Sequence, residues 1–154
     1  MSRGFEARLA ALGITLPAVF PPAGNYLGCK RVGGVLYVGG HGPVGTAGIK
    51  RGKVGRDLDL AAAQQAARAT ALSMLATVRA ELGTLDRVRQ IVKVFGMVNC
   101  APGFNLTPAV MDGCSDVLVA VFGDAGRHTR SAVGMAELPF DIAVEIEMIV
   151  EVDP

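Results

Sequence analysis

The chain has 154 residues, about the size of one domain, and 51% of them are apolar, which supplies a folded core and argues against disorder. Its 15 basic and 14 acidic residues give a net charge of +1, which argues against a nucleic-acid partner bound through a basic surface. No apolar run reaches membrane-spanning length, no signal sequence is found, and the three scattered cysteines are typical of free thiols, so we expect a cytoplasmic protein with no membrane partner.

The first third of the chain is predicted to form a short helix and a hairpin. Residues 4–12 place apolar side chains on one side of a helix: Phe5, Leu9 and Leu12. Strands are predicted at 25–30 and 35–39, because Gly33-Gly34 between them is a hairpin turn signal. A glycine-rich loop is expected over 40–56.

Two amphipathic helices are predicted in the middle of the chain. Apolar residues recur at helical spacing over 60–82, with Asp59 placed to cap the start and Gly83 the end. A second helix is expected over 107–122, where Thr107 is the predicted N-cap and Pro108 the first helical residue.

Three further strands complete the pattern. They are predicted at 88–98, 130–137 and 142–152, and the last two are expected to form a hairpin joined by residues 138–141. The order is then β-β-α-β-α-β-β. This order predicts an α+β fold with both helices on one face of the sheet.

The last strand has two different faces. Alternate residues from Ile142 to Val152 are apolar, whereas Glu145 and Glu147 point to the other side. If apolar faces match across the predicted hairpin, Arg130 falls on the glutamate side. Small residues share its face: Ala132, Gly134 and Ala136. We expect the helices to cover the apolar face and another subunit to meet the glutamate face; the alternative is a solvated face with weak surface ion pairs.

Two motifs resemble the RidA/YjgF family, also described as endoribonuclease L-PSP-like. The segment Arg130–Glu147 fits R-S-x-V-x-x-A-x-L-P-x-x-x-x-V-E-I-E, and Tyr26–Val44 fits Y…G-x-L-Y-V-x-G-x-x-P-V. The resemblance runs from about residue 26 to 152 of a single domain, 1–154. An N-terminal extension at 1–16 and the G-G-H-G motif indicate a divergent subgroup.

The resemblance implies a chorismate-mutase-like fold that assembles as a homotrimer with clefts for small carboxylates between subunits. It implies that Arg130 holds the substrate carboxylate, for which a planar guanidinium is suited. In deaminating members, an imine or enamine is hydrolysed to a 2-keto acid and ammonia. There Glu145 would place the water and Tyr26 would line the cleft. No cofactor and no metal ion are expected.

The sequence departs from the deaminating pattern in two motifs. Gly39-Gly40-His41 stands where that pattern has Ser-Gly-Gln, and Ala132 stands where it has cysteine. Losing the serine hydroxyl removes a polar contact to the substrate, so two functions stay open. One is an enzyme that hydrolyses reactive imines or enamines, and the other is a non-catalytic trimer that binds a keto acid. A ribonuclease is the third candidate.

The two histidines are His41 and His128, and either is suited to acid–base chemistry near neutral pH. His41 stands at the family's glutamine position, which favours a place in the cleft. For His128, two residues before Arg130, a hydrogen bond to a loop carbonyl is favoured. The G-x-G-x-x-G spelling of Gly40–Gly45 is rejected as a dinucleotide site because no helix is predicted to begin within it.

Overall fold

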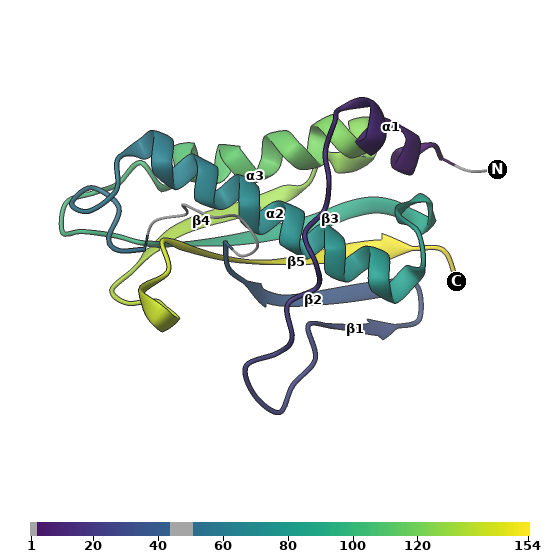
Figure 1. The fold of residues 1–154 in the computed structure, drawn as a ribbon, viewed down its shortest axis with the longest axis horizontal. Coiled ribbons are helices and arrows are strands. Elements are labelled where there is room, and N and C mark those ends of the chain that lie inside the picture. The colour runs from purple at the N-terminus through teal and green to yellow at the C-terminus, as the bar shows by residue number, and fades with distance from the viewer. Residues whose placement is uncertain (1–2, 44–50) are drawn as a thin grey trace.

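A mixed sheet with helices on one face is the framework of the structure, a computed structural model that describes residues 3–43 and 51–154. In these residues the sheet has five strands in the order β1-β2-β5-β3-β4, and α2 and α3 lie together on one side of it (Figure 1). The elements in chain order are α1 (Phe5–Ala11), β1 (Cys29–Val32), β2 (Val35–His41), α2 (Leu60–Leu82), β3 (Val88–Asn99), α3 (Thr107–Phe122), β4 (Thr129–Met135) and β5 (Val144–Val152). The predicted α+β fold, with two helices on one face, is confirmed.

The local signals for the long helices work as expected, with one exception. The side chain of Asp59 accepts a hydrogen bond from the Ala62 amide at 2.8 Å, and Gly83 ends α2 with a φ of 80°. Thr107 is not the N-cap of α3, because its hydroxyl donates to the Ala132 carbonyl of β4 at 2.9 Å instead. That bond ties the first turn of α3 to the edge strand.

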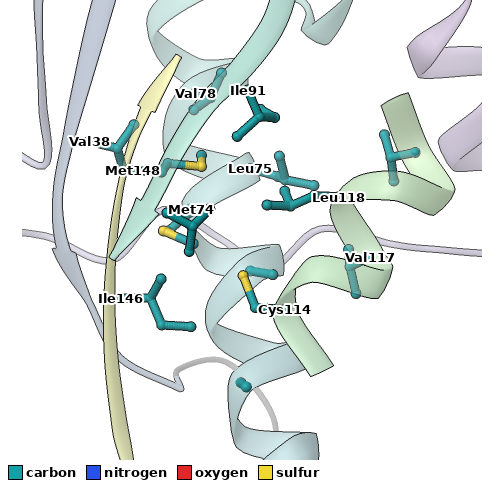
Figure 2. Close-up of a cluster of buried hydrophobic side chains, with 14 of the residues drawn as sticks. Val38, Met74, Leu75, Val78, Ile91, Cys114, Val117, Leu118, Ile146 and Met148 are labelled. Carbon is teal, nitrogen blue, oxygen red and sulfur yellow. The ribbon is translucent and has the colours of Figure 1, made fainter. Parts of the chain in front are cut away.

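The core lies between β5 and the helices, on the predicted apolar face of the strand. Every second residue from Val144 to Val152 is buried. Figure 2 shows Ile146 and Met148 among side chains of α2 and α3, including Met74 and Leu118. Ile142 lies before the strand and is only partly buried.

The predicted final hairpin is wrong. β5 lies between β2 and β3, while β4 pairs with β3 in parallel at the edge of the sheet. Arg130 is therefore level with Val94, whose side chain is fully buried under the helices. Glu145 is level with Met97 on the uncovered face of the sheet. Arg130 and Glu145 therefore lie on opposite faces, because Val94 and Met97 are an odd number of residues apart along β3.

The small residues Ala132 and Gly134 lie on the helix-covered face with Arg130, not on the glutamate face where they were expected. A methyl group added at Gly134 would lie 3.0 Å from the Cys100 sulfur, and the Ala132 carbonyl receives the Thr107 hydroxyl. Small side chains here let other parts of the same chain approach closely.

The N-terminal segment packs onto the domain. The Phe5 ring meets Phe122 of α3 edge-on at 4.9 Å, whereas Leu12, expected on the same side, is 46% exposed. The first strand begins at Cys29, later than expected. Val44 and Gly45 of the two quoted motifs lie outside the described residues. Among the described residues, no helix combines the length and apolar character needed to cross a bilayer.

Candidate functional site

A cavity of about 660 Å³ brings together several of the predicted site residues. It opens where β2 ends and β5 begins, and Tyr26, His41 and Glu145 all line it. Arg51 and Ser73 are also in its lining, and neither was a sequence-based candidate. Their places in the chain carried no signal, since only the fold brings the 51–59 loop and α2 to this point. Within residues 3–43 and 51–154, no cluster of three His, Cys, Asp or Glu side chains is placed to hold a metal ion.

Glu145 is the half-buried acid of this cavity. Burial raises the pKa of its carboxyl group above the ordinary value, and the neighbouring charge of Glu147 raises it further. A methyl group added at Gly40 would overlap Glu145 Oε1, so glycine at that position leaves room for the carboxyl group. No hydrogen bond or ion pair joins Glu145 to another described residue. The group is thus left available to a ligand or to water.

His41 is fixed by two hydrogen bonds. Its Nδ1 lies 2.7 Å from the Gly39 carbonyl, and its Nε2 lies 2.8 Å from the Thr77 hydroxyl of α2. A carbonyl oxygen only accepts, so in the neutral ring Nδ1 donates and Nε2 accepts from Thr77. Burial lowers the pKa of His41, which favours this neutral form. The ring is thus a wall of the cavity with both nitrogens occupied, and its acid–base role stays a prediction.

Arg130 is held by α3, outside this cavity. One guanidinium nitrogen, Nη1, donates to Asp112 Oδ1 at 3.0 Å and to the Ser115 hydroxyl at 3.1 Å. The other, Nη2, donates to the Pro108 carbonyl at 3.2 Å. The Arg130 side chain is 22% exposed, so the guanidinium is oriented yet reaches solvent. A single subunit therefore does not bring Arg130 beside Glu145.

His128 lies behind Arg130 and extends its hydrogen-bond network. Its Nδ1 donates to the Gly126 carbonyl at 2.7 Å, so its Nε2, at 2.9 Å from Ser115 Oγ, accepts from that hydroxyl. Ser115 then accepts from Arg130 and donates to His128. The predicted bond to a loop carbonyl is present. Burial lowers the pKa of His128, which keeps the ring neutral and able to accept.

Sequence reasoning missed Asp112 and Ser115. They are three residues apart, which places them on one face of a helix. That spacing was visible in the sequence. Their relation to Arg130 was not, because it depends on β4 lying beside β3 under α3.

Gly39 and Ala132 are separated in a single subunit. The Gly39 amide donates to the Gly28 carbonyl at 2.9 Å, and the residue lines a second hollow of about 470 Å³ on the uncovered face, together with Tyr26. Ala132 faces the start of α3. Neither lines the cavity that holds Glu145 among the described residues.

The uncovered face of the sheet exposes large apolar side chains. Tyr37 on β2 is 49% exposed and Val133 on β4 is 37% exposed, with partly buried Phe95, Met97 and Ile149 between them. Apolar side chains spread over one sheet face are typical of a surface that meets another protein chain.

Comparisons with known proteins agree with this fold. A family model described as YjgF/chorismate mutase-like, putative endoribonuclease, matches residues 6–152. The chain is 43% identical to Protein TCP17 from Trypanosoma cruzi over 149 residues, which cover 96% of this chain and 93% of that protein.

Solved structures resemble it over nearly the whole chain. The protein Atu1372 of unknown function from Agrobacterium tumefaciens is 43% identical with a TM-score of 0.88, covering 99% of this chain and 94% of that one. A putative endoribonuclease from Shewanella oneidensis is 31% identical with a TM-score of 0.91, covering 96% and 99%. Escherichia coli TdcF, solved with bound serine, is 22% identical with a TM-score of 0.58 over 90% and 94%, and shares the fold alone.

Proposed function

This chain belongs to the YjgF/chorismate mutase-like, putative endoribonuclease family, and on that premise we propose that it is a RidA-like homotrimer that hydrolyses reactive imines or enamines. The products would be a 2-keto acid and ammonia. The observation that carries this proposal is the Glu145 carboxyl group, half-buried and unpaired among the described residues, in a cavity that holds His41 and Tyr26.

The chemistry needs a carboxyl group that exchanges a proton near neutral pH, and a raised pKa suits Glu145 for it. Glu145 accepts a hydrogen bond from a water molecule, whose oxygen attacks the imine carbon while its proton passes to Glu145. Glu145 passes that proton to the imine nitrogen, which gives a tetrahedral carbinolamine. Glu145 then takes the proton of the new hydroxyl group and delivers it to the leaving nitrogen as the carbon–nitrogen bond breaks. Ammonia departs and the carbonyl of the 2-keto acid remains. Addition of water changes no oxidation state, so the reaction requires no redox cofactor.

In this proposal, Arg130 supplies the carboxylate anchor from a neighbouring subunit. Arg130 and Glu145 lie on opposite faces of one sheet, so Arg130 does not reach this cavity within one subunit, and a second copy would bring its own Arg130 there. Three contacts from α3 orient the guanidinium in advance, which lowers the entropic cost of gripping a carboxylate. Burying the apolar side chains of the uncovered face would stabilise the trimer.

The second candidate is a trimer that binds a keto acid without turnover. Two features favour it over hydrolysis. Gly39 offers no hydroxyl to the ligand, and both ring nitrogens of His41 are occupied within the protein. Both candidates use Arg130, and only the enzyme needs Glu145 to move a proton.

The test is release of ammonia from imino acids made in place by an amino-acid oxidase, with semicarbazide trapping the imine in competition. The wild-type protein should accelerate release, and Glu145→Gln should abolish the acceleration while keeping keto-acid binding. Glu81→Gln is the control, because Glu81 is an exposed glutamate of α2 that does not line the cavity. Keto-acid binding without any acceleration by the wild type would replace the enzyme with the binding protein.

A further inference from the structure

The rim of the Glu145 cavity carries two exposed phenyl rings. Phe20 is 60% exposed and Phe140 is 71% exposed, and both line the cavity although they are 120 residues apart in the sequence. Prolines extend the apolar wall: Pro21, Pro22, Pro43 and Pro139. The polar part of the lining is small and includes Glu145, His41 and Arg51. An apolar wall with a few converging polar groups is the usual composition of a small-molecule site.

Phe140 is displayed by a strained backbone. Its φ is 56° and that of Asp141 is 57°, in the left-handed region that side-chain-bearing residues rarely adopt. For a bulky aromatic residue this is a true outlier. Phe140 gains no burial in return, since its ring stays in solvent. Strained residues of this kind are concentrated at ligand sites, where the surrounding structure holds them in place.

Hydrogen bonds from outside the turn fix the strained conformation. The Asn99 side-chain amide donates to Asp141 Oδ1 at 3.0 Å, and the Gly52 amide donates to the Asp141 carbonyl at 2.8 Å. Within the turn, the Asp141 amide donates to Leu138 and the Ile142 amide to Pro139, each at 3.2 Å. The backbone that carries Phe140 at the cavity is therefore fixed before any ligand arrives.

Phe20 is presented by a stiff segment as well. The residue before a proline is restricted to extended conformations, and Phe20 precedes Pro21-Pro22, whose rings fix two successive φ angles. Both rings are thus carried by backbone with little freedom to lose. Walls that are ordered in advance bind an apolar group at low entropic cost.

We propose that this cavity selects carboxylate substrates with a large apolar side chain, an aryl or branched alkyl group held against Phe20 and Phe140. The inference rests on the proposed function, in which the cavity receives a 2-imino acid at Glu145. A substrate with only a methyl group would leave most of a 660 Å³ cavity and both phenyl rings in water. An aryl side chain would cover both phenyl rings. The carboxylate would then face the guanidinium groups of Arg51 and of Arg130 from the neighbouring subunit, away from the apolar wall.

The test compares binding of two keto acids, pyruvate and phenylpyruvate, by titration calorimetry. The wild-type protein should bind phenylpyruvate at least about tenfold more tightly, since one methylene in an apolar pocket is already worth about that much. Phe20→Ala should lower this ratio about tenfold. Val19→Ala is its matched control, because Val19 is 47% exposed next to Phe20 but does not line the cavity.

Phe140→Gly separates the role of the ring from a role in folding. Glycine adopts a φ of 56° without strain, so this variant should unfold at a higher temperature than the wild type and still lose the preference for phenylpyruvate. A merely structural ring would give the opposite pattern, a lower unfolding temperature with the preference intact.

The outcomes separate this inference from the proposed function. Equal affinities for the two keto acids, or a preference that survives both ring deletions, overturns the inference while imine hydrolysis still stands. Absence of turnover with a ring-dependent preference overturns hydrolysis and leaves the inference intact. Absence of binding to either keto acid overturns both.

Discussion

Replacing Arg130 by alanine tests the assignment on which both candidate functions depend. The variant removes a guanidinium that would make two charge-assisted hydrogen bonds to a ligand carboxylate, each contributing about 1.5–3 kcal/mol. Part of that is offset, because Asp112 already pairs with Arg130 at 3.0 Å and the ligand must compete with it. The Asp112 side chain is 55% exposed, so this pair contributes only about 0.2–1 kcal/mol.

The net effect on binding is then about 2–6 kcal/mol, or a Kd raised at least roughly 30-fold. Arg130→Lys should restore little of it, because an ammonium group cannot contact Ser115 and the Pro108 carbonyl while presenting two parallel N–H groups to a ligand. Asp112→Asn should shift binding in the other direction, with a Kd lowered about two- to fivefold, because it removes a competing charge.

Calorimetric titration with a keto acid measures all three variants, and sedimentation shows whether each keeps the assembly of the wild type. If Arg130→Ala binds the ligand as tightly as the wild type, Arg130 is not the anchor and the resemblance has misled us about this site. If Asp112→Asn weakens binding, Asp112 orients the guanidinium rather than competing for it.

Three further predictions concern stability, assembly and substrate class. The pKa of Glu145 is raised in the folded state, so its ionisation lowers the stability of the fold as pH rises from about 4.5 through the folded pKa. Glu145→Gln should therefore unfold at a higher temperature than the wild type at pH 7 and at a nearly equal temperature at pH 4, and an equal difference at both pH values would contradict this. Sedimentation equilibrium should give three chains per particle for the wild type and smaller species for Val133→Glu, which adds charge to the uncovered face. A wild-type monomer at micromolar concentration would refute a cleft shared between subunits. The net charge of +1 predicts that purified protein does not cleave labelled single-stranded RNA in a way that depends on Arg130. Cleavage that is lost in Arg130→Ala but kept in the control Arg68→Ala, on α2, would establish a ribonuclease instead.

The sequence by itself determined the elements and most of their order. Asp59 and Gly83 mark the two ends of α2 through bonds made within a few residues, so the helix bounds could be predicted from local signals. The alternating apolar residues of β5 likewise identified the face that the helices cover. Tyr26, His41 and Glu145 were matched to a cleft through motif resemblance, and all three line one cavity.

Only the tertiary structure decided where β4 pairs and which way Arg130 points. Strand pairing joins residues far apart in the sequence, and an edge strand with small residues on one face fits a hairpin as well as a crossover. That pairing brings Arg130 into contact with Asp112 and Ser115. The strained turn before β5 places Phe140 at the cavity that Phe20 also lines. Their spacing in the chain gave no sign of these contacts, because the free energy that forms them comes from packing the whole domain rather than from neighbouring residues.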